Sequence, residues 1–182
     1  SRPDVYVYYE PGLQFNGWKS LWALATGKGI GAQICRAYGE LSARYTPGDR
    51  IILSGYSRGA FAVRSLSGLI DAIGLLKSNC VSDHTIDQAW QFYQNGATSD
   101  RAKYFQTNYC LAHIKIDAVG VWDTVRALGL RPPYLDAILP DPNAFHSHDL
   151  PACVHAGFHA MAHDEVRSAF QLVKWDTCYN PE

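Results

Sequence analysis

Residues 50–73 constrain the fold of this chain more than any other segment. A short apolar run, Arg50–Ser54, leads into Gly55-Tyr56-Ser57-Arg58-Gly59, and from Arg58 to about Ile73 apolar side chains recur at helical spacing. An apolar run of this length is typical of a strand buried in a parallel sheet. The segment therefore predicts a strand, a tight turn and a helix in direct succession.

The rest of the sequence continues this alternation. Further strands are predicted at Val5–Tyr9, Ile114–Trp122 and Gln171–Trp175, and further helices at Ile30–Tyr45, Thr85–Asn95, Asp100–Asn108 and Val154–Phe170. Residues 46–49 predict a turn, Gly74 a helix C-cap, and residues 131–151 a loop rich in proline. The alternation predicts one α/β domain over residues 1–182, with a mostly parallel sheet and helices on both faces.

Composition excludes several classes of protein. Hydrophobic residues make up 47% and charged residues 18%, and the net charge is −1, so bulk electrostatics would not draw the chain to nucleic acid. No apolar run approaches the ~20 residues of a membrane-spanning helix, and no secretory signal pattern is visible at the start. Since none of the five cysteines forms a C-x-x-C pair, free thiols in a reducing compartment are expected.

The glycine-flanked serine matches the pattern G-x-S-x-G of a nucleophile elbow. In such an elbow a sharp turn exposes the serine hydroxyl above the sheet edge, and we expect Gly55 and Gly59 to remove side chains that would collide there. The N–H of Arg58, at the start of the helix, would stabilise an oxyanion. Ser57 is therefore predicted to be a nucleophile. The alternative is a serine that only caps the helix.

Asp123 is the predicted acidic partner of Ser57. It directly follows the predicted strand that ends at Trp122, and carboxyl ends of parallel strands meet at one sheet edge. Asp117 lies inside the same strand and fits this role less well. The alternative for Asp123 is that it caps a following turn or helix.

Four segments occur in a characteristic order: YYEPG, AYGELSARYTPGDRIILSGYSRGAFAVRSLSGLIDAIGLL, VGVWDTVRALGL and GFHAMAHDEVRSAF. Together they resemble the α/β-hydrolase domain of the type VI secretion phospholipase effector family and its relatives of unassigned function. That group typically shows G-F-S-R-G-A, then G-V-W-D-T-V, then H-A-L-A-x-D-E, and the resemblance covers nearly the whole chain. It implies a bacterial serine esterase or lipase that acts on phospholipid or other acyl esters and needs no cofactor.

The resemblance also bears on the catalytic histidine. His159 matches the histidine of H-A-L-A-x-D-E and is the candidate base, with a structural histidine on a packed helix as the alternative. Asp164 and Glu165 match the acidic pair of that motif. Family members carry a further segment, G-x-H-x-D-x-G-G, and a D-G-T loop that this chain does not show. The chain is therefore expected to be part of a longer domain.

Metal and phosphate sites are weaker alternatives. His159 and His163 have the spacing of a zinc motif, but Ala160 replaces the glutamate that the motif requires. His146-Ser147-His148-Asp149 offers metal ligands without a further ligand pattern, and Gly27-Lys28-Gly29-Ile30-Gly31 lacks the ending of a phosphate loop. No metal is therefore predicted.

Two functional hypotheses follow from the sequence. The first is an esterase or lipase whose partners are a lipid substrate, a membrane surface contacted peripherally, and an immunity or secretion-apparatus protein. Such a protein would be cytoplasmic in the producing cell and exported without a signal peptide. The second is a catalytically silent hydrolase-like module that binds lipid or a protein partner.

Overall fold

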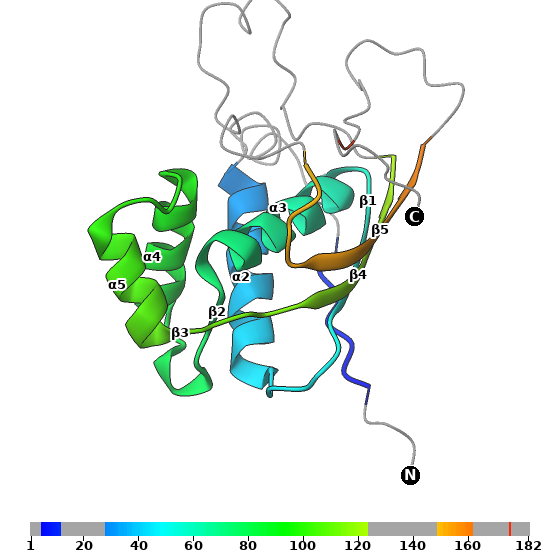
Figure 1. Ribbon diagram of the computed structural model, residues 1–182. Helices are drawn as coiled ribbons and strands as arrows, with labels where there is room; N and C mark the ends of the chain where they lie inside the picture. Colours follow the sequence, from blue (N-terminus) through cyan, green and yellow to red (C-terminus); the bar gives the residue numbers. More distant parts are fainter. Residues whose placement is uncertain (1–4, 12–27, 124–148, 162–174, 176–182) are drawn as a thin grey trace, which may run out of the picture.

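The structure is a computed structural model that describes residues 5–11, 28–123, 149–161 and 175 (Figure 1). The elements in chain order are α2 (Lys28–Arg44), β1 (Ile52–Tyr56), α3 (Arg58–Ile73), β2 (Leu75–Leu76), a 3₁₀ turn (Ser78–Cys80), α4 (Asp83–Gln94), α5 (Asp100–Tyr109), β3 (Cys110–Leu111), β4 (Ile116–Trp122) and β5 (Val154–Ala160).

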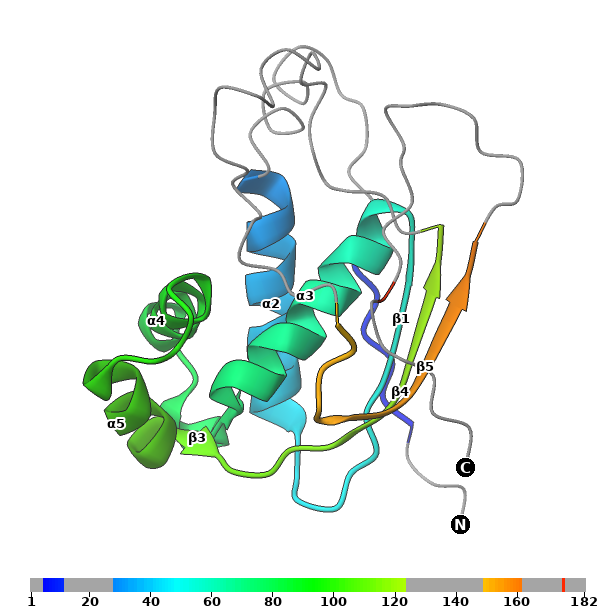
Figure 2. The same cartoon turned by 45° about the horizontal axis from the view of Figure 1, so that its top comes forward.

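A three-stranded parallel sheet in the order β1-β4-β5 forms one layer, and α3 packs against β1 and β4. The second layer continues through α2, which packs on α3 (Figure 2). The short antiparallel pair β2-β3 lies beside α4 and α5, away from the main sheet. This arrangement confirms the predicted α/β fold with a mostly parallel sheet.

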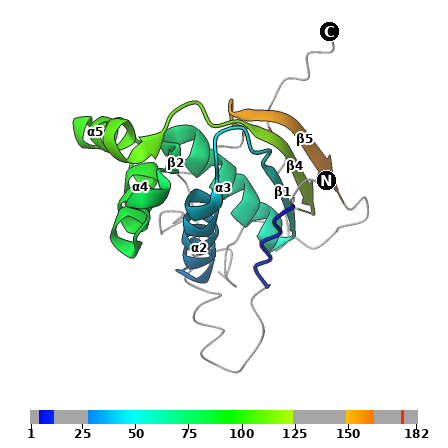
Figure 3. The same cartoon turned by 90° about the horizontal axis from the view of Figure 1, so that it is seen from below.

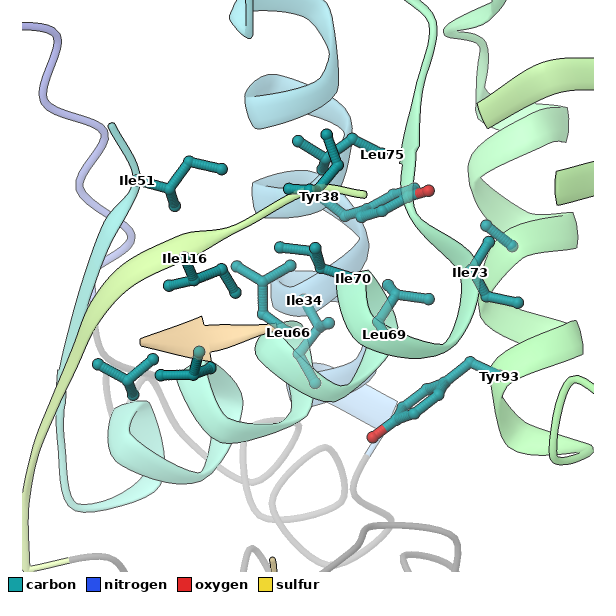
Figure 4. Close-up of a cluster of buried hydrophobic side chains, with 14 of the residues drawn as sticks. Ile34, Tyr38, Ile51, Leu66, Leu69, Ile70, Ile73, Leu75, Tyr93 and Ile116 are labelled. Carbon is teal, nitrogen blue, oxygen red and sulfur yellow. The ribbon is translucent and has the colours of Figure 1, made fainter. Parts of the chain in front are cut away.

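The core lies between the sheet and the helices, and the apolar stripe predicted for α3 forms its centre (Figure 4). Leu69 is fully buried and Ile70 is 2% exposed, because both face the neighbouring layers. Tyr38 of α2 is also fully buried, and its hydroxyl donates to the Gly74 carbonyl over 2.8 Å. Each such buried side chain stabilises the fold by about 1.5–3 kcal/mol.

The boundaries of α3 follow the local sequence signals. The helix spans Arg58–Ile73, as predicted, and ends at Gly74, whose φ of 87° lies in the left-handed region that favours glycine. The Gly74 N–H donates to the Ile70 carbonyl over 2.8 Å. A Cβ at Gly74 would lie 2.6 Å from the Leu111 carbonyl oxygen, so the close passage of β3 also requires glycine there.

The helix predicted from Val154 to Phe170 is wrong over its first part, because Val154–Ala160 is β5. The sequence signal was weak there, since Ala156, Gly157 and Ala160 carry little or no side chain to fix a period. The parallel register from Ile116 opposite Val154 to Trp122 opposite Ala160 satisfies backbone groups that β4 would otherwise leave unpaired. Tertiary pairing therefore overrides the helical pattern.

The predicted strand Val5–Tyr9 is also wrong, because the structure assigns no strand to these residues. They run beside β1, and the bonds that hold them come from the side chains of α2 (Figure 3). The Tyr6 hydroxyl donates to Glu40 over 2.5 Å, and Arg36 forms an ion pair with Glu10. The β-rich composition predicted an extended segment, but side-chain bonds to a helix replace the strand ladder.

The two faces of the sheet differ. In the part of the chain that the structure describes, α2 and α3 lie on one face (Figure 3), and large side chains of the opposite face are exposed. These exposed residues are Ile52, Tyr56, Trp122 and Phe158. Two predictions lie largely outside the described residues: the loop at 131–151 and the strand at Gln171–Trp175.

Candidate active site

The candidate site lies at the carboxyl edge of the sheet, where three strands end in register. Tyr56 pairs with Trp122, and Trp122 pairs with Ala160. The ladder extends one step further, because the Ser57 N–H donates to the Trp122 carbonyl over 2.8 Å and the Asp123 N–H donates to the Ala160 carbonyl over 2.9 Å. The structure thus places Ser57 and Asp123 at the same level on neighbouring strands.

Ser57 occupies a strained turn. Its φ is 55° and its ψ is −118°, a conformation that residues with a Cβ rarely adopt. It separates β1 from α3 without any intervening loop, so the chain reverses within this one residue. Strain of this kind costs about 1–3 kcal/mol and persists only where the surrounding structure imposes it.

The alternative role of Ser57 as a helix cap does not match its geometry. Its side chain makes no capping hydrogen bond to α3. The Ser57 carbonyl instead accepts the N–H groups of Ala60 and Phe61, at 3.1 and 3.3 Å. Arg58 is the first residue of α3, so its N–H has no partner within the helix. The hydroxyl is therefore not used to stabilise the helix.

Gly55 and Gly59 differ in the space that is available for a side chain. A Cβ at Gly55 would lie 2.4 Å from the Gly59 carbonyl oxygen and 2.7 Å from the Ala60 nitrogen, so β1 and α3 can approach this closely only with glycine at 55. A Cβ at Gly59 would meet no atom of the described residues within 4 Å. The expected crowding is thus found at Gly55, and the described residues show none at Gly59.

Asp123 lies in a second unusual turn, with a φ of 45° directly after β4. Asp117 lies six residues earlier and is occupied elsewhere. Its carboxylate accepts from Arg50 over 2.9 Å and from the Ile51 N–H over 3.0 Å, and the Arg50 bond is the main cause that lowers the pKa of Asp117. Asp117 therefore fixes the start of the sheet, and Asp123 is the carboxylate at the carboxyl edge.

His159 lies on β5 opposite Val121, not on a helix. Paired residues of neighbouring strands project to the same face, and Val121 is 1% exposed in the core beneath α3. His159 therefore faces α3. Its ring meets that of Trp175 edge-on, with centroids 5.4 Å apart.

Burial lowers the pKa of His159, and the positive charge of Arg64 lowers it further. The negative charge of Asp123 raises it and only partly offsets these causes. His159 Nε2 is buried, and no hydrogen-bond partner for it is found in the part of the chain that the structure describes. These surroundings therefore favour the neutral form of the imidazole.

The other histidines do not reach this edge or lie outside the described residues. His84 belongs to α4, and His113 lies between β3 and β4. His155 lies on β5 near its amino end and is exposed. The remaining candidates His146, His148 and His163 lie outside the described residues, together with Asp164 and Glu165. His159 is thus the described histidine at the end of the sheet where Ser57 and Asp123 lie.

Two residues of this region were missed by the sequence reasoning. Arg64 is only 9% exposed although it is charged, and its guanidinium carbon lies 5.2 Å from the ring centroid of Trp175. A charged residue three positions after Phe61, on the buried stripe of α3, was the signal that could have identified Arg64. Trp175 had no such signal, because its contacts depend on the tertiary structure.

None of the cysteines that the structure describes lies at this edge of the sheet. Cys35, Cys80, Cys110 and Cys153 are free thiols, as predicted, and Cys178 lies outside the described residues. Burial raises the pKa of Cys110 to about 11 and that of Cys153 to about 12. A raised pKa disfavours the thiolate, so Cys110 and Cys153 are poor candidates for a nucleophile.

No group of three or more potential metal ligands comes together within residues 5–11, 28–123, 149–161 and 175. No helix in the same part of the chain is long and apolar enough to cross a membrane.

Residues 1–182 match the model of the family described as T6SS, phospholipase effector Tle1-like, catalytic domain. The chain belongs to this family. The match covers the whole chain. It confirms the family resemblance that the motifs indicated.

A curated relative of this Tle1-like domain is an uncharacterized protein of the yeast Saccharomyces cerevisiae, YEL023C. It is 34% identical over 108 residues, which are 53% of this chain and 16% of the relative. The chain thus spans less than a fifth of the length of the relative that it matches. No solved structure matches the chain.

Proposed function

We propose that this Tle1-like domain is a serine esterase of the phospholipase type, with Ser57 as its nucleophile. The observation that carries the proposal is the strained turn at Ser57, which lies in register with Asp123 at the carboxyl edge of a parallel sheet. A strained backbone at a sheet edge is typical of a functional residue. Since the Ser57 side chain does not cap α3, its hydroxyl is available for chemistry.

In the proposed reaction the Ser57 oxygen attacks the carbonyl carbon of an ester. His159 accepts the proton of the Ser57 hydroxyl, and Asp123 orients the imidazole and stabilises its charged form. The N–H of Arg58, at the start of α3, donates to the oxyanion. The imidazolium then returns the proton to the leaving alcohol, and water hydrolyses the acyl-enzyme by the same route.

The proposed substrates are phospholipids or other acyl esters, because the matched family is described as a phospholipase effector family. Contact with a membrane surface, export by the type VI apparatus and pairing with an immunity protein belong to the same proposal. The proposed acyl transfer needs no metal or cofactor, since serine, histidine and aspartate suffice for it.

A second candidate is a catalytically silent hydrolase-like module that binds lipid or a protein partner. The position of His159 favours it. His159 pairs with Val121, two residues before Asp123. Measured along the strand direction, its backbone therefore lies about 7 Å further from the carboxyl edge than that of Ser57. Its side chain also faces α3 rather than the open edge. A base has to come within hydrogen-bond reach of the serine hydroxyl.

Labelling with a fluorophosphonate separates the two candidates, because this probe reacts covalently with an activated serine. We expect the wild-type chain to be labelled and Ser57→Ala not to be. Ser54→Ala is the matched control, since Ser54 is exposed on the same strand three residues earlier and should leave labelling intact. Equal labelling of the wild type and Ser57→Ala would contradict the nucleophile, and an unlabelled wild type would favour the silent module.

The substrate class needs a second assay. Phosphatidylcholine and phosphatidylethanolamine vesicles would be incubated with the wild type, Ser57→Ala and Asp123→Asn, and released fatty acid would be measured by mass spectrometry. We expect release only with the wild type at a substantial rate, because loss of the orienting carboxylate costs about 10⁴ in kcat in serine hydrolases. Release that does not depend on Ser57 would contradict the proposed mechanism.

A further inference from the structure

Arg64 is an unusual feature of α3, since it places a charge in the layer between helix and sheet. Its side chain is 9% exposed, whereas arginine is almost never fully buried unless it is paired. The guanidinium carbon lies 5.2 Å from the ring centroid of Trp175, within the range of a cation–π interaction. The guanidinium of α3 and the indole of Trp175 therefore pack against each other in this layer.

Trp175 connects Arg64 to His159. The rings of Trp175 and His159 meet edge-on at 69°, with centroids 5.4 Å apart. The same indole therefore contacts the guanidinium from α3 and the imidazole from β5. Because Trp175 fills the space on one side of the His159 ring, it limits the rotations that the imidazole can make.

The charges around His159 are unequal in effect. Within the described residues, the charges that act on it are those of Arg64 on α3 and of Asp123 at the end of β4, and Trp175, which contacts its ring, contributes no charge. The guanidinium disfavours protonation of the imidazole, and Asp123 favours it less strongly. The buried Nε2, without a partner in the described part of the chain, has no bond there that would stabilise an added proton.

We propose that Arg64 is a positioning residue which, through its contact with Trp175, holds the imidazole of His159 in a fixed orientation. The indole does this by packing between the guanidinium and the imidazole, and the positive charge of Arg64 in addition favours the neutral imidazole. The consequence for catalysis rests on the proposed function, because only a neutral imidazole can accept the Ser57 proton. The link between Arg64 and His159 does not depend on catalysis and can be measured without it.

The direct test is an NMR titration of the histidine ring protons in the full chain. Arg64→Met removes the charge and keeps much of the side-chain volume, and Arg64→Lys keeps the charge. We expect the titration midpoint of His159 to move to higher pH in Arg64→Met and to stay near the wild-type position in Arg64→Lys. His155 is the internal control, since it is exposed on the same strand and should respond to neither variant.

An unchanged His159 midpoint in a folded Arg64→Met variant would overturn the proposal. If that variant does not fold, the wild type decides, because a His159 midpoint at or above the ordinary histidine value would also overturn it. Trp175→Leu tests the packing role: we expect broadened His159 ring signals, and an unchanged line width would contradict that role.

Activity provides the second readout. In a plot of kcat/KM against pH, we expect the acidic limb of Arg64→Met to lie at higher pH than that of the wild type. A purely structural arginine would lower the rate equally at every pH. If the wild type shows no Ser57-dependent activity, the proposed function fails, and the NMR titration still decides the role of Arg64 separately.

Discussion

Replacing Gly55 with alanine is the sharpest test of the turn around Ser57. The new Cβ would lie 2.4, 2.6 and 2.7 Å from three backbone atoms of Gly59 and Ala60. Because these atoms belong to the first turn of α3, no side-chain rotation can relieve the contact. The helix would have to move by about 1 Å from β1 to reach ordinary contact distances.

The expected cost follows from this geometry. Overpacking typically destabilises a protein by about 1–3 kcal/mol, and rigid backbone neighbours place Gly55→Ala at the upper end, near 3 kcal/mol. In a protein of this length that corresponds to a loss of roughly 6–12 °C in Tm. Gly59→Ala is the matched control, since the same substitution meets no described atom within 4 Å and lies in a helix. It should gain about 0.5–1 kcal/mol.

Urea denaturation followed by tryptophan fluorescence measures both variants. Both replace glycine with alanine, so the change in unfolded-state entropy is the same and cancels in the comparison. We expect Gly55→Ala to have the lower midpoint with an unchanged m-value. A Gly55→Ala variant as stable as Gly59→Ala would refute the close strand–helix contact on which the elbow geometry depends.

Three further predictions concern strain and protonation. Ser57→Gly should be more stable than Ser57→Ala by about 1 kcal/mol in urea denaturation, because glycine adopts a φ of 55° without strain; equal stabilities would argue against the strained turn. Gly74→Ala should lower Tm through its φ of 87° and the contact with Leu111, and an unchanged Tm would contradict the cap. The pKa of His159 is lower in the folded protein than the ordinary value of 6.5, so the unfolded chain binds this proton more tightly and stability should fall as pH drops from about 7 to 5. His159→Gln should weaken this dependence in urea denaturation at each pH, and an identical dependence would contradict the lowered pKa.

The local part of the site followed from sequence alone. The serine turn and the boundaries of α3 depend on residues that are adjacent in the chain, namely the apolar run, Gly55 and the Gly74 cap. The position of Asp123 at the same edge followed from one rule of parallel sheets, and the register confirms it. Such features depend mainly on neighbours in the chain and on the common direction of parallel strands, so the sequence is enough to predict them.

Only the tertiary structure decided the surroundings of His159. The segment from Val154 has no strong period, and it became a strand because β4 offered it a row of unpaired backbone groups. Pairing with Val121 then turned His159 toward α3, where Arg64 and Trp175 meet it from distant parts of the chain. Burial and charge at such a point depend on which segments meet in space, so the order of residues alone does not determine them.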